Sequence, residues 1–179
     1  MLFASPTLSL LIKAPAGQEF SEIYILGLNQ NFDNLPFNIV AGVNYTVYLG
    51  VNNQMGSTCY YTALLKIANE SGSLPNATLE APSTLPTLYE FNTFLSDGGT
   101  WEAPLTFQVN ELSFNGVASE LSDVTINGVQ FPINLTSTWD SANFGYYYYL
   151  FVELWLYNSA IGISQYNNRF VSLVLNMTQ

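Results

Sequence analysis

Apolar and polar residues alternate along much of this chain, and a period of two is typical of strands with one face toward a core. In residues 43–51, one face carries Val43, Tyr45, Val47, Leu49 and Val51. The alternation resumes in residues 57–69, after a turn that contains Asn52, Asn53 and Gly56. We therefore predict that these two segments form a hairpin with one buried face.

The same pattern predicts strands at residues 8–13, 23–26, 87–96, 105–109, 124–126, 129–131, 146–157 and 169–178. Asn127-Gly128 separates two of them and favours a two-residue hairpin turn. Val117 to Leu121 is predicted to form a helical turn. Residues 70–86 are rich in Ser, Pro and Gly and are long for a connection in a compact domain, which makes them a candidate functional or crossover loop.

Eight or nine short strands separated by turns indicate an all-β fold, a single-domain antiparallel β-sandwich of Ig-like form over residues 1–179. Residues 1–14 are either a first strand or the edge of a membrane-anchored region. The sequence has no run of about 18 apolar residues, so we expect no segment of it to span a bilayer.

Charge is scarce: charged residues make up 9% of the chain, with three bases, thirteen acids, no histidine and a net charge of −10 at pH 7. Nucleic acid and anionic lipid are poor partners, because both require clusters of Lys or Arg. Without histidine there is no imidazole for a zinc site, a Ser-His-Asp triad or acid–base catalysis. We expect a non-enzymatic domain with no metal and no cofactor.

The polar surface consists mainly of amides and hydroxyls, which do not change when carboxylates with pKa values near ~4 are protonated. We therefore hypothesise an acidic extracellular habitat, as for the surface protein of a thermoacidophile. The alternative is an ordinary acidic domain of unusual composition.

One face of the predicted strand 146–157 carries an aromatic row of Tyr147, Tyr149, Phe151, Trp155 and Tyr157. Rings on every second residue, about 7 Å apart, make a platform on which a sugar or a protein partner could pack. The alternative, which we favour, is that a loop such as 70–86 or a second layer covers the row as part of the core.

Glu153 lies within this row. We predict a structural ion pair between Glu153 and Arg169 in the last strand. The alternative is a carboxyl group whose pKa is raised by the aromatic surroundings and which acts as a general acid.

Three further carboxylates, Glu90, Asp97 and Glu102, flank a Gly-Gly turn. Two such groups could perform glycosidase chemistry or bind calcium, but solvated turn residues are the favoured interpretation.

Cys59 is the one cysteine and is predicted to be a buried, inert thiol. Five Asn-x-Ser/Thr sequons are possible glycosylation sites and mildly favour an exported glycoprotein: Asn44, Asn69, Asn76, Asn134 and Asn176.

Several separated blocks resemble one family: Phe20–Gly27, Pro36–Asn52, Trp101–Phe107, Phe151–Tyr157 and Arg169–Thr178. Together they are similar to the soluble domain of archaeal membrane proteins catalogued as domain of unknown function 1616. One departure is Phe170, where the family pattern has Trp. The resemblance implies a domain outside the cell that follows a membrane-embedded N-terminal part, and it supplies no catalytic residues.

We therefore expect an interaction or structural module at the outer face of an archaeal membrane, with a protein or glycan as partner. Two alternatives stay open. One is a carboxylate-based carbohydrate-active enzyme or a glycan-binding module. The other is a surface subunit that forms homo-oligomers through its edge strands.

Overall fold

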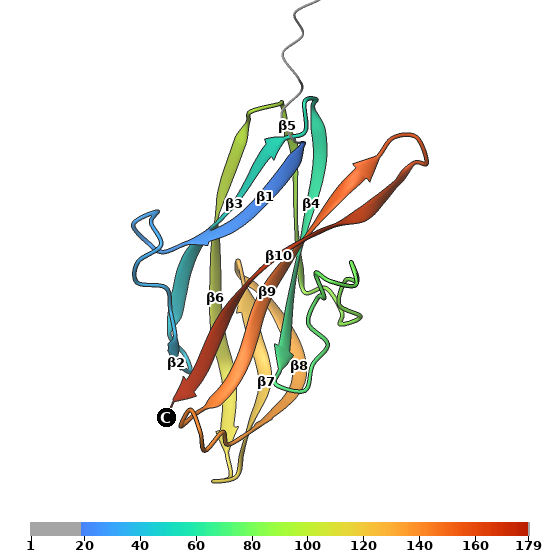
Figure 1. The fold of residues 1–179 in the computed structure, drawn as a ribbon. Helices are drawn as coiled ribbons and strands as arrows, with labels where there is room; N and C mark the ends of the chain where they lie inside the picture. The colour runs from blue at the N-terminus through green and yellow to red at the C-terminus, as the bar shows by residue number, and fades with distance from the viewer. Residues whose placement is uncertain (1–18, 179) are drawn as a thin grey trace, which may run out of the picture.

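The alternating residues form ten strands in the computed structural model, which describes residues 19–178 (Figure 1). The strands are β1 (Phe20–Leu26), β2 (Asn38–Val40), β3 (Asn44–Gln54), β4 (Cys59–Asn69), β5 (Tyr89–Leu95), β6 (Thr100–Phe114), β7 (Ala118–Ile126), β8 (Val129–Thr138), β9 (Tyr146–Asn158) and β10 (Ile163–Thr178). Residues 19–178 contain no helix that could cross a membrane. The strand predicted at 8–13 lies outside the described residues.

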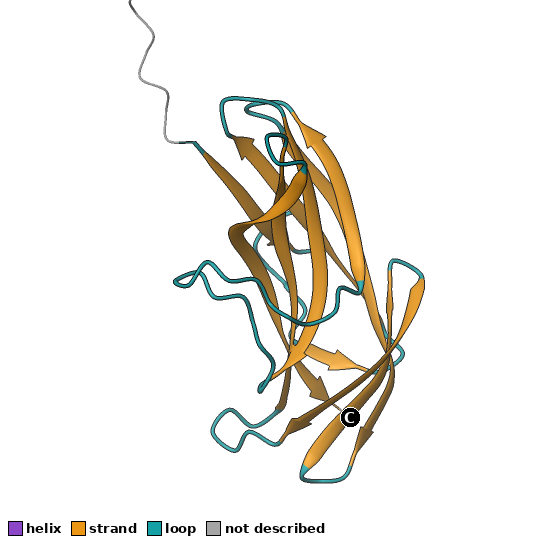
Figure 2. Cartoon of the chain, turned by 90° about the vertical axis from the view of Figure 1, so that its right-hand side faces the viewer, coloured by secondary structure: helices purple, strands orange, loops and turns teal. Residues whose placement is uncertain are grey.

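Two five-stranded sheets pack face to face (Figures 1 and 2). Sheet A has the order β1-β3-β6-β7-β8, and sheet B has the order β2-β10-β9-β4-β5. All neighbours are antiparallel except β2 and β10, which are parallel over three residue pairs. The predicted β-sandwich is confirmed, with ten strands instead of eight or nine.

The core lies between the sheets and is made of the residues that alternate in the sequence. Leu49 on β3, Leu65 on β4 and Val152 on β9 are all fully buried. On β9, the leucine and valine face packs into this core, so the aromatic row is on the outer face of sheet B.

The predicted hairpin of 43–51 with 57–69 is wrong, because β3 lies in sheet A and β4 in sheet B. The chain crosses between the sheets after the fully buried Asn53. The Asn53 Nδ2 donates a hydrogen bond to the Leu95 carbonyl (2.9 Å), and its Oδ1 accepts one from the Tyr61 hydroxyl (3.0 Å). Alternation shows which face of a strand is buried and does not show which strand lies beside it.

The Asn127–Gly128 turn between β7 and β8 is confirmed, with φ of 47° and 79° at the two residues, as a type I′ turn requires. The helical turn predicted for 117–121 is wrong, because this segment enters β7. Ser119 takes an inward position there, and its hydroxyl is hydrogen-bonded to that of Tyr148 (3.0 Å). Because Ser119 is a polar residue at a core position, it interrupts the apolar alternation that would have predicted a strand there.

On the outer face of sheet A, the Tyr24 ring lies across Gly50. A Cβ at position 50 would overlap this ring. The Tyr24 hydroxyl continues over β3 and donates a hydrogen bond to the Glu102 carboxylate on β6 (2.8 Å). Burial, together with this bond and the charge of Glu102, raises the pKa of Tyr24 to about 12.

Gly50→Ala is expected to lower the free energy of unfolding by about 1–3 kcal/mol, because the added methyl group displaces the Tyr24 ring. Urea denaturation measures this. In a Tyr24→Ala background the ring is gone, so the same glycine substitution should cost much less. An equal loss of unfolding free energy in both backgrounds would show that the added methyl group does not act through the Tyr24 ring.

Candidate binding site

The structure divides the aromatic row of β9 into three parts. The loop of residues 70–88, called here the crossing loop, lies over the centre of the row, where Phe151 and Glu153 are fully buried. Tyr147 and Tyr149 lie beyond it at one end, beside Phe37. Tyr157 lies at the other end and is 44% exposed. A continuous platform along β9 therefore does not form.

The buried Glu153 carboxylate is held by donors from three elements. The Lys66 Nζ on β4 lies 3.0 Å from its Oε2, and the Trp155 Nε1 donates to the same oxygen (3.1 Å). The backbone N–H of Ser83 in the crossing loop donates to Oε1 (2.6 Å). The Lys66 Nζ also donates to the Ser83 carbonyl (2.8 Å), so the Glu153–Lys66 pair binds both the N–H and the carbonyl of one loop residue.

The predicted ion pair of Glu153 with Arg169 is therefore wrong. Pairing between β9 and β10 shifts between Tyr166 and Arg169, so Glu153 faces Phe170 and Arg169 faces Leu154. Arg169 alternates in step with the inward-facing Leu173 and Leu175 of β10, whereas Glu153 lies on the outer face of sheet B, so the two side chains point to opposite faces. The bulge contains Asn168, whose φ is 54°.

The crossing loop is also held at its start. The Glu70 Oε1 accepts hydrogen bonds from the backbone N–H and the hydroxyl of Thr138 at the end of β8 (both 2.8 Å). Burial acts to raise the pKa of Glu70, but the hydrogen bonds from Thr138 outweigh it and the pKa lies below its ordinary value.

The other candidate carboxylates do not converge. Glu90 accepts a hydrogen bond from Asn92 on sheet B, Glu102 accepts from Tyr24 on sheet A, and Asp97 accepts from the Gly56 backbone in a turn. The described residues contain no group of three or more potential metal ligands from His, Cys, Asp and Glu.

Cys59 is half-buried, and its thiol lies 3.6 Å from the Ser57 carbonyl.

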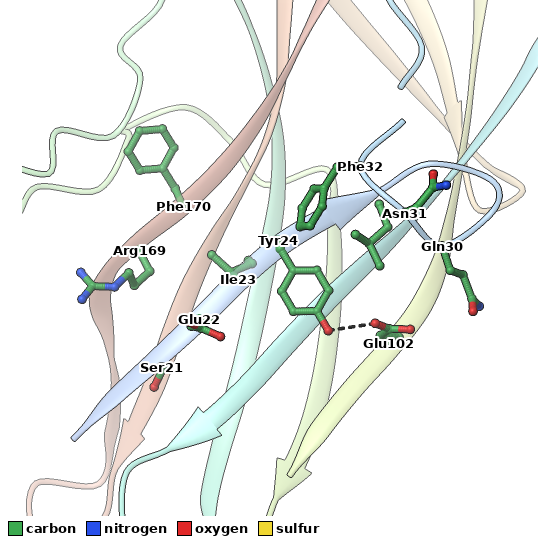
Figure 3. A pocket seen from close by; sticks show the side chains of 11 residues that line it. Ser21, Glu22, Ile23, Tyr24, Gln30, Asn31, Phe32, Glu102, Arg169 and Phe170 are labelled. Atoms are coloured by element: carbon green, nitrogen blue, oxygen red, sulfur yellow. Dashed lines mark hydrogen bonds between the residues drawn. The ribbon is translucent and has the colours of Figure 1, made fainter. Parts of the chain in front are cut away.

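A groove of about 740 Å³, the β1 groove, runs along the free edge of β1. Figure 3 shows Tyr24 and Phe32 on one side and Arg169 and Phe170 of β10 on the other. Phe32 is 72% exposed. Arg169 forms no ion pair with any carboxylate of residues 19–178, and its Nη1 donates to the Asn168 carbonyl (3.1 Å).

A second cavity of about 810 Å³, the hairpin cleft, lies where β4 and β9 separate. The β9–β10 hairpin swings away from the rest of sheet B at this point (Figure 1). Its walls come from the start of β4, the hairpin tip, the β10 bulge and Glu80 of the crossing loop. Two buried polar atoms of this wall, Tyr166 Oη and Asn168 Oδ1, have no hydrogen-bond partner within the described residues.

Three aromatic side chains from three strands meet at the hairpin cleft. Phe94 on β5 is 74% exposed and its ring centroid lies 4.6 Å from that of Tyr60 on β4. The Tyr157 ring lies 6.3 Å from Tyr60 and stands at 80° to it. Sequence reasoning singled out Tyr157 but not Tyr60 or Phe94, because no pattern along the chain shows that β5, β4 and β9 are neighbours.

The sequons differ in their surroundings. Asn44, Asn76 and Asn134 are exposed. The Nδ2 of Asn69 donates to the Thr136 carbonyl (2.7 Å), and that of Asn176 donates to the Asn38 side chain (3.0 Å). A glycan is attached through Nδ2, so the three exposed sites are the accessible ones.

A family model described as "Domain of unknown function (DUF1616)" matches residues 14–115, more than half of the chain. The chain belongs to the DUF1616 family. The match covers β1 to β6, which include the Tyr24–Glu102 contact and two of the three aromatic residues of the hairpin cleft. No curated protein matches the sequence at a significant level.

Among solved structures, this DUF1616 domain is similar to the CARDB domain of a Pyrococcus furiosus protein in complex with di-metal ions, with 6% identity, 89% of each chain covered and a TM-score of 0.44. Two structures of a Listeria innocua beta-glucosidase, with gluconolactone and with glucose, match at 6% and 10% identity and TM-scores of 0.44 and 0.36. They cover 90% and 66% of this chain, which spans 16% of theirs. These likenesses concern general fold and say nothing of a ligand or an activity here.

Lys66→Met is expected to lower the free energy of unfolding by about 3–5 kcal/mol, because it leaves the Glu153 carboxylate buried without its cation. Urea denaturation measures this, and proteolysis should cut the crossing loop faster. A Lys66→Met/Glu153→Gln double variant should recover part of the loss. Glu90→Gln changes an exposed carboxylate and is the matched control. If Lys66→Met lowers the free energy of unfolding no more than this control does, Lys66 does not stabilise the buried Glu153 carboxylate.

Glu70→Gln is expected to lower the melting temperature at neutral pH and to have a fading effect in acid. The folded state depresses the pKa of Glu70, so its stabilisation is present above the ordinary value of 4.5 and is lost as pH falls through the lower folded value. Thermal melts of both proteins across this range measure the difference. Glu111→Gln, at an exposed carboxylate, is the control. A difference in melting temperature between wild type and Glu70→Gln that grows as the pH falls would contradict the prediction.

Proposed function

We propose that this DUF1616 domain is a non-enzymatic binding module at the outer face of an archaeal membrane, and that the hairpin cleft receives its partner. The observation that carries the proposal is the meeting of Tyr60, Phe94 and Tyr157 at the mouth of the cleft. Exposed aromatic clusters are costly to solubility and mark sites of interaction.

The outer location is supported by the family resemblance and by the composition. An acidic chain with few bases is poorly suited to nucleic acid or to an anionic membrane surface. The exposed sequons Asn44, Asn76 and Asn134 are compatible with passage through a glycosylating export route.

A binding role is favoured over catalysis because the carboxylates singled out in the sequence do not converge and are engaged in structural hydrogen bonds: Glu90, Asp97, Glu102 and Glu153. Glu153 is enclosed beneath the crossing loop and has no access to a substrate. In the β1 groove Glu22 and Glu102 share one cavity, but Glu102 is hydrogen-bonded to Tyr24. A glycosidase needs two carboxyl groups free to face a substrate from opposite sides.

The labelled domain is expected to bind saturably to cell envelopes of the source organism. A Phe94→Ala/Tyr157→Ala variant should lose most of this binding, because it removes the exposed rings of the cleft. Its matched control is Phe32→Ala/Phe144→Ala, at residues that are 72% and 75% exposed elsewhere on the molecule. Thermal melts verify that all proteins are folded.

Equal binding by the cleft variant and the wild type would refute the assignment of the site. Light scattering over a concentration series addresses the rival assembly model, which is favoured by the edge of β1 that no strand within residues 19–178 pairs with. We expect a monomer, and concentration-dependent growth would favour a self-assembling subunit instead.

A further inference from the structure

We infer that the hairpin cleft binds a neutral glycan. The inference rests on the proposed binding function and names the chemistry of the partner. It draws on three properties of the cleft: the arrangement of its rings, the kind of polar group in its walls and the absence of bases among its lining residues.

The rings suit the apolar face of a sugar. A hexose presents a patch of C–H groups on its ring face and hydroxyls around its edge, so an aromatic ring packs on the face while polar side chains meet the edge. Phe94, 74% exposed, and Tyr157, 44% exposed, present ring surface to the solvent at this point. The Tyr60 hydroxyl is engaged with Asn92 Oδ1 (2.8 Å), which fixes its ring between the other two.

The angle between the rings makes a corner. Tyr60 and Phe94 are inclined at 43°, and Tyr157 stands at 80° to Tyr60. A flat crystalline polysaccharide needs coplanar rings, whereas a corner admits one sugar ring or a single chain. The volume of about 810 Å³ falls within the range of small-ligand sites.

The walls supply uncharged hydrogen-bonding groups in number. They include Ser57, Thr58, Asn158, Ser159, Gln165 and Asn167. Hydroxyls of a sugar both donate and accept, as these side chains do.

The charge of the cleft selects against other ligands. Among residues 19–178, Glu19 and Glu80 line it, and no lysine or arginine does. A sulfated or uronic glycan, a phosphate or an anionic lipid would meet carboxylates with no compensating cation. A protein anchor favours a drier, more apolar patch, which describes the β1 groove better than this cleft.

Titration calorimetry with short neutral oligosaccharides of glucose, mannose, galactose and N-acetylglucosamine tests the inference. We expect at least one series to bind, and Phe94→Ala and Tyr157→Ala each to weaken it by about tenfold. Phe32→Ala, in the β1 groove, should bind like the wild type. Uronic-acid oligomers and crystalline cellulose should not bind, and the bound oligosaccharide should be recovered uncleaved.

Failure of every neutral oligosaccharide to bind overturns the inference, as does binding that Phe94→Ala and Tyr157→Ala leave unchanged. If envelopes still capture the domain through these two residues while no oligosaccharide binds, the partner is a protein and the proposed function stands without the glycan. If neither envelopes nor oligosaccharides bind, both proposals fall. Release of cleaved sugar would replace the binding module with an enzyme.

Discussion

A buried carboxylate determines how the outer face of sheet B is arranged. Glu153 has no exposed surface, and an ionised carboxyl in such a place is tolerated only with a cation and hydrogen-bond donors around it. Lys66 and Trp155 come from neighbouring strands, but the third donor, the Ser83 N–H, comes from the crossing loop. The loop must therefore lie across the centre of the sheet, and it is this placement that leaves the surface beyond it open.

The β10 bulge decides what that open surface contains. Arg169 follows the bulge and lines the β1 groove, and the hairpin on the other side of the bulge leaves the plane of sheet B (Figure 1). The hairpin cleft is the space that results. One irregularity thus separates two cavities of different character: one has an arginine and a free strand edge, and the other has acids, amides and aromatic rings.

Hydrogen bonds between uncharged side chains connect the two sheets, in line with the scarcity of charged residues in the chain. The Asn53 side chain on β3 hydrogen-bonds to Leu95 at the end of β5 and to Tyr61 of β4, and Ser119 with Tyr148 links β7 to β9 across the core. These amide and hydroxyl groups do not titrate in acid, unlike the Glu70 carboxylate. These connections between the sheets are therefore of a kind that protonation of the carboxylates leaves intact.

Most of the strands, their inward faces and the Asn127–Gly128 turn could be predicted from the sequence, because alternation and turn chemistry are local properties. The short β2 and the start of β7 could not. It also pointed to a loop near 70–86 as something more than a connection. Family membership followed from short blocks spread along the chain, of which the matched region includes the first three.

Only the tertiary structure decided which strands are neighbours. A strand with one apolar face can pack in either sheet. The sequence therefore predicted a hairpin of β3 and β4, whereas the structure places the two strands in different sheets. Glu153 pairs with Lys66 of the adjacent β4 and not with Arg169, because Lys66 shares its outer face of sheet B and Arg169 does not. Tyr60, Phe94 and Tyr157 meet for the same reason: they are distant in sequence, and sheet order and register alone bring their rings together.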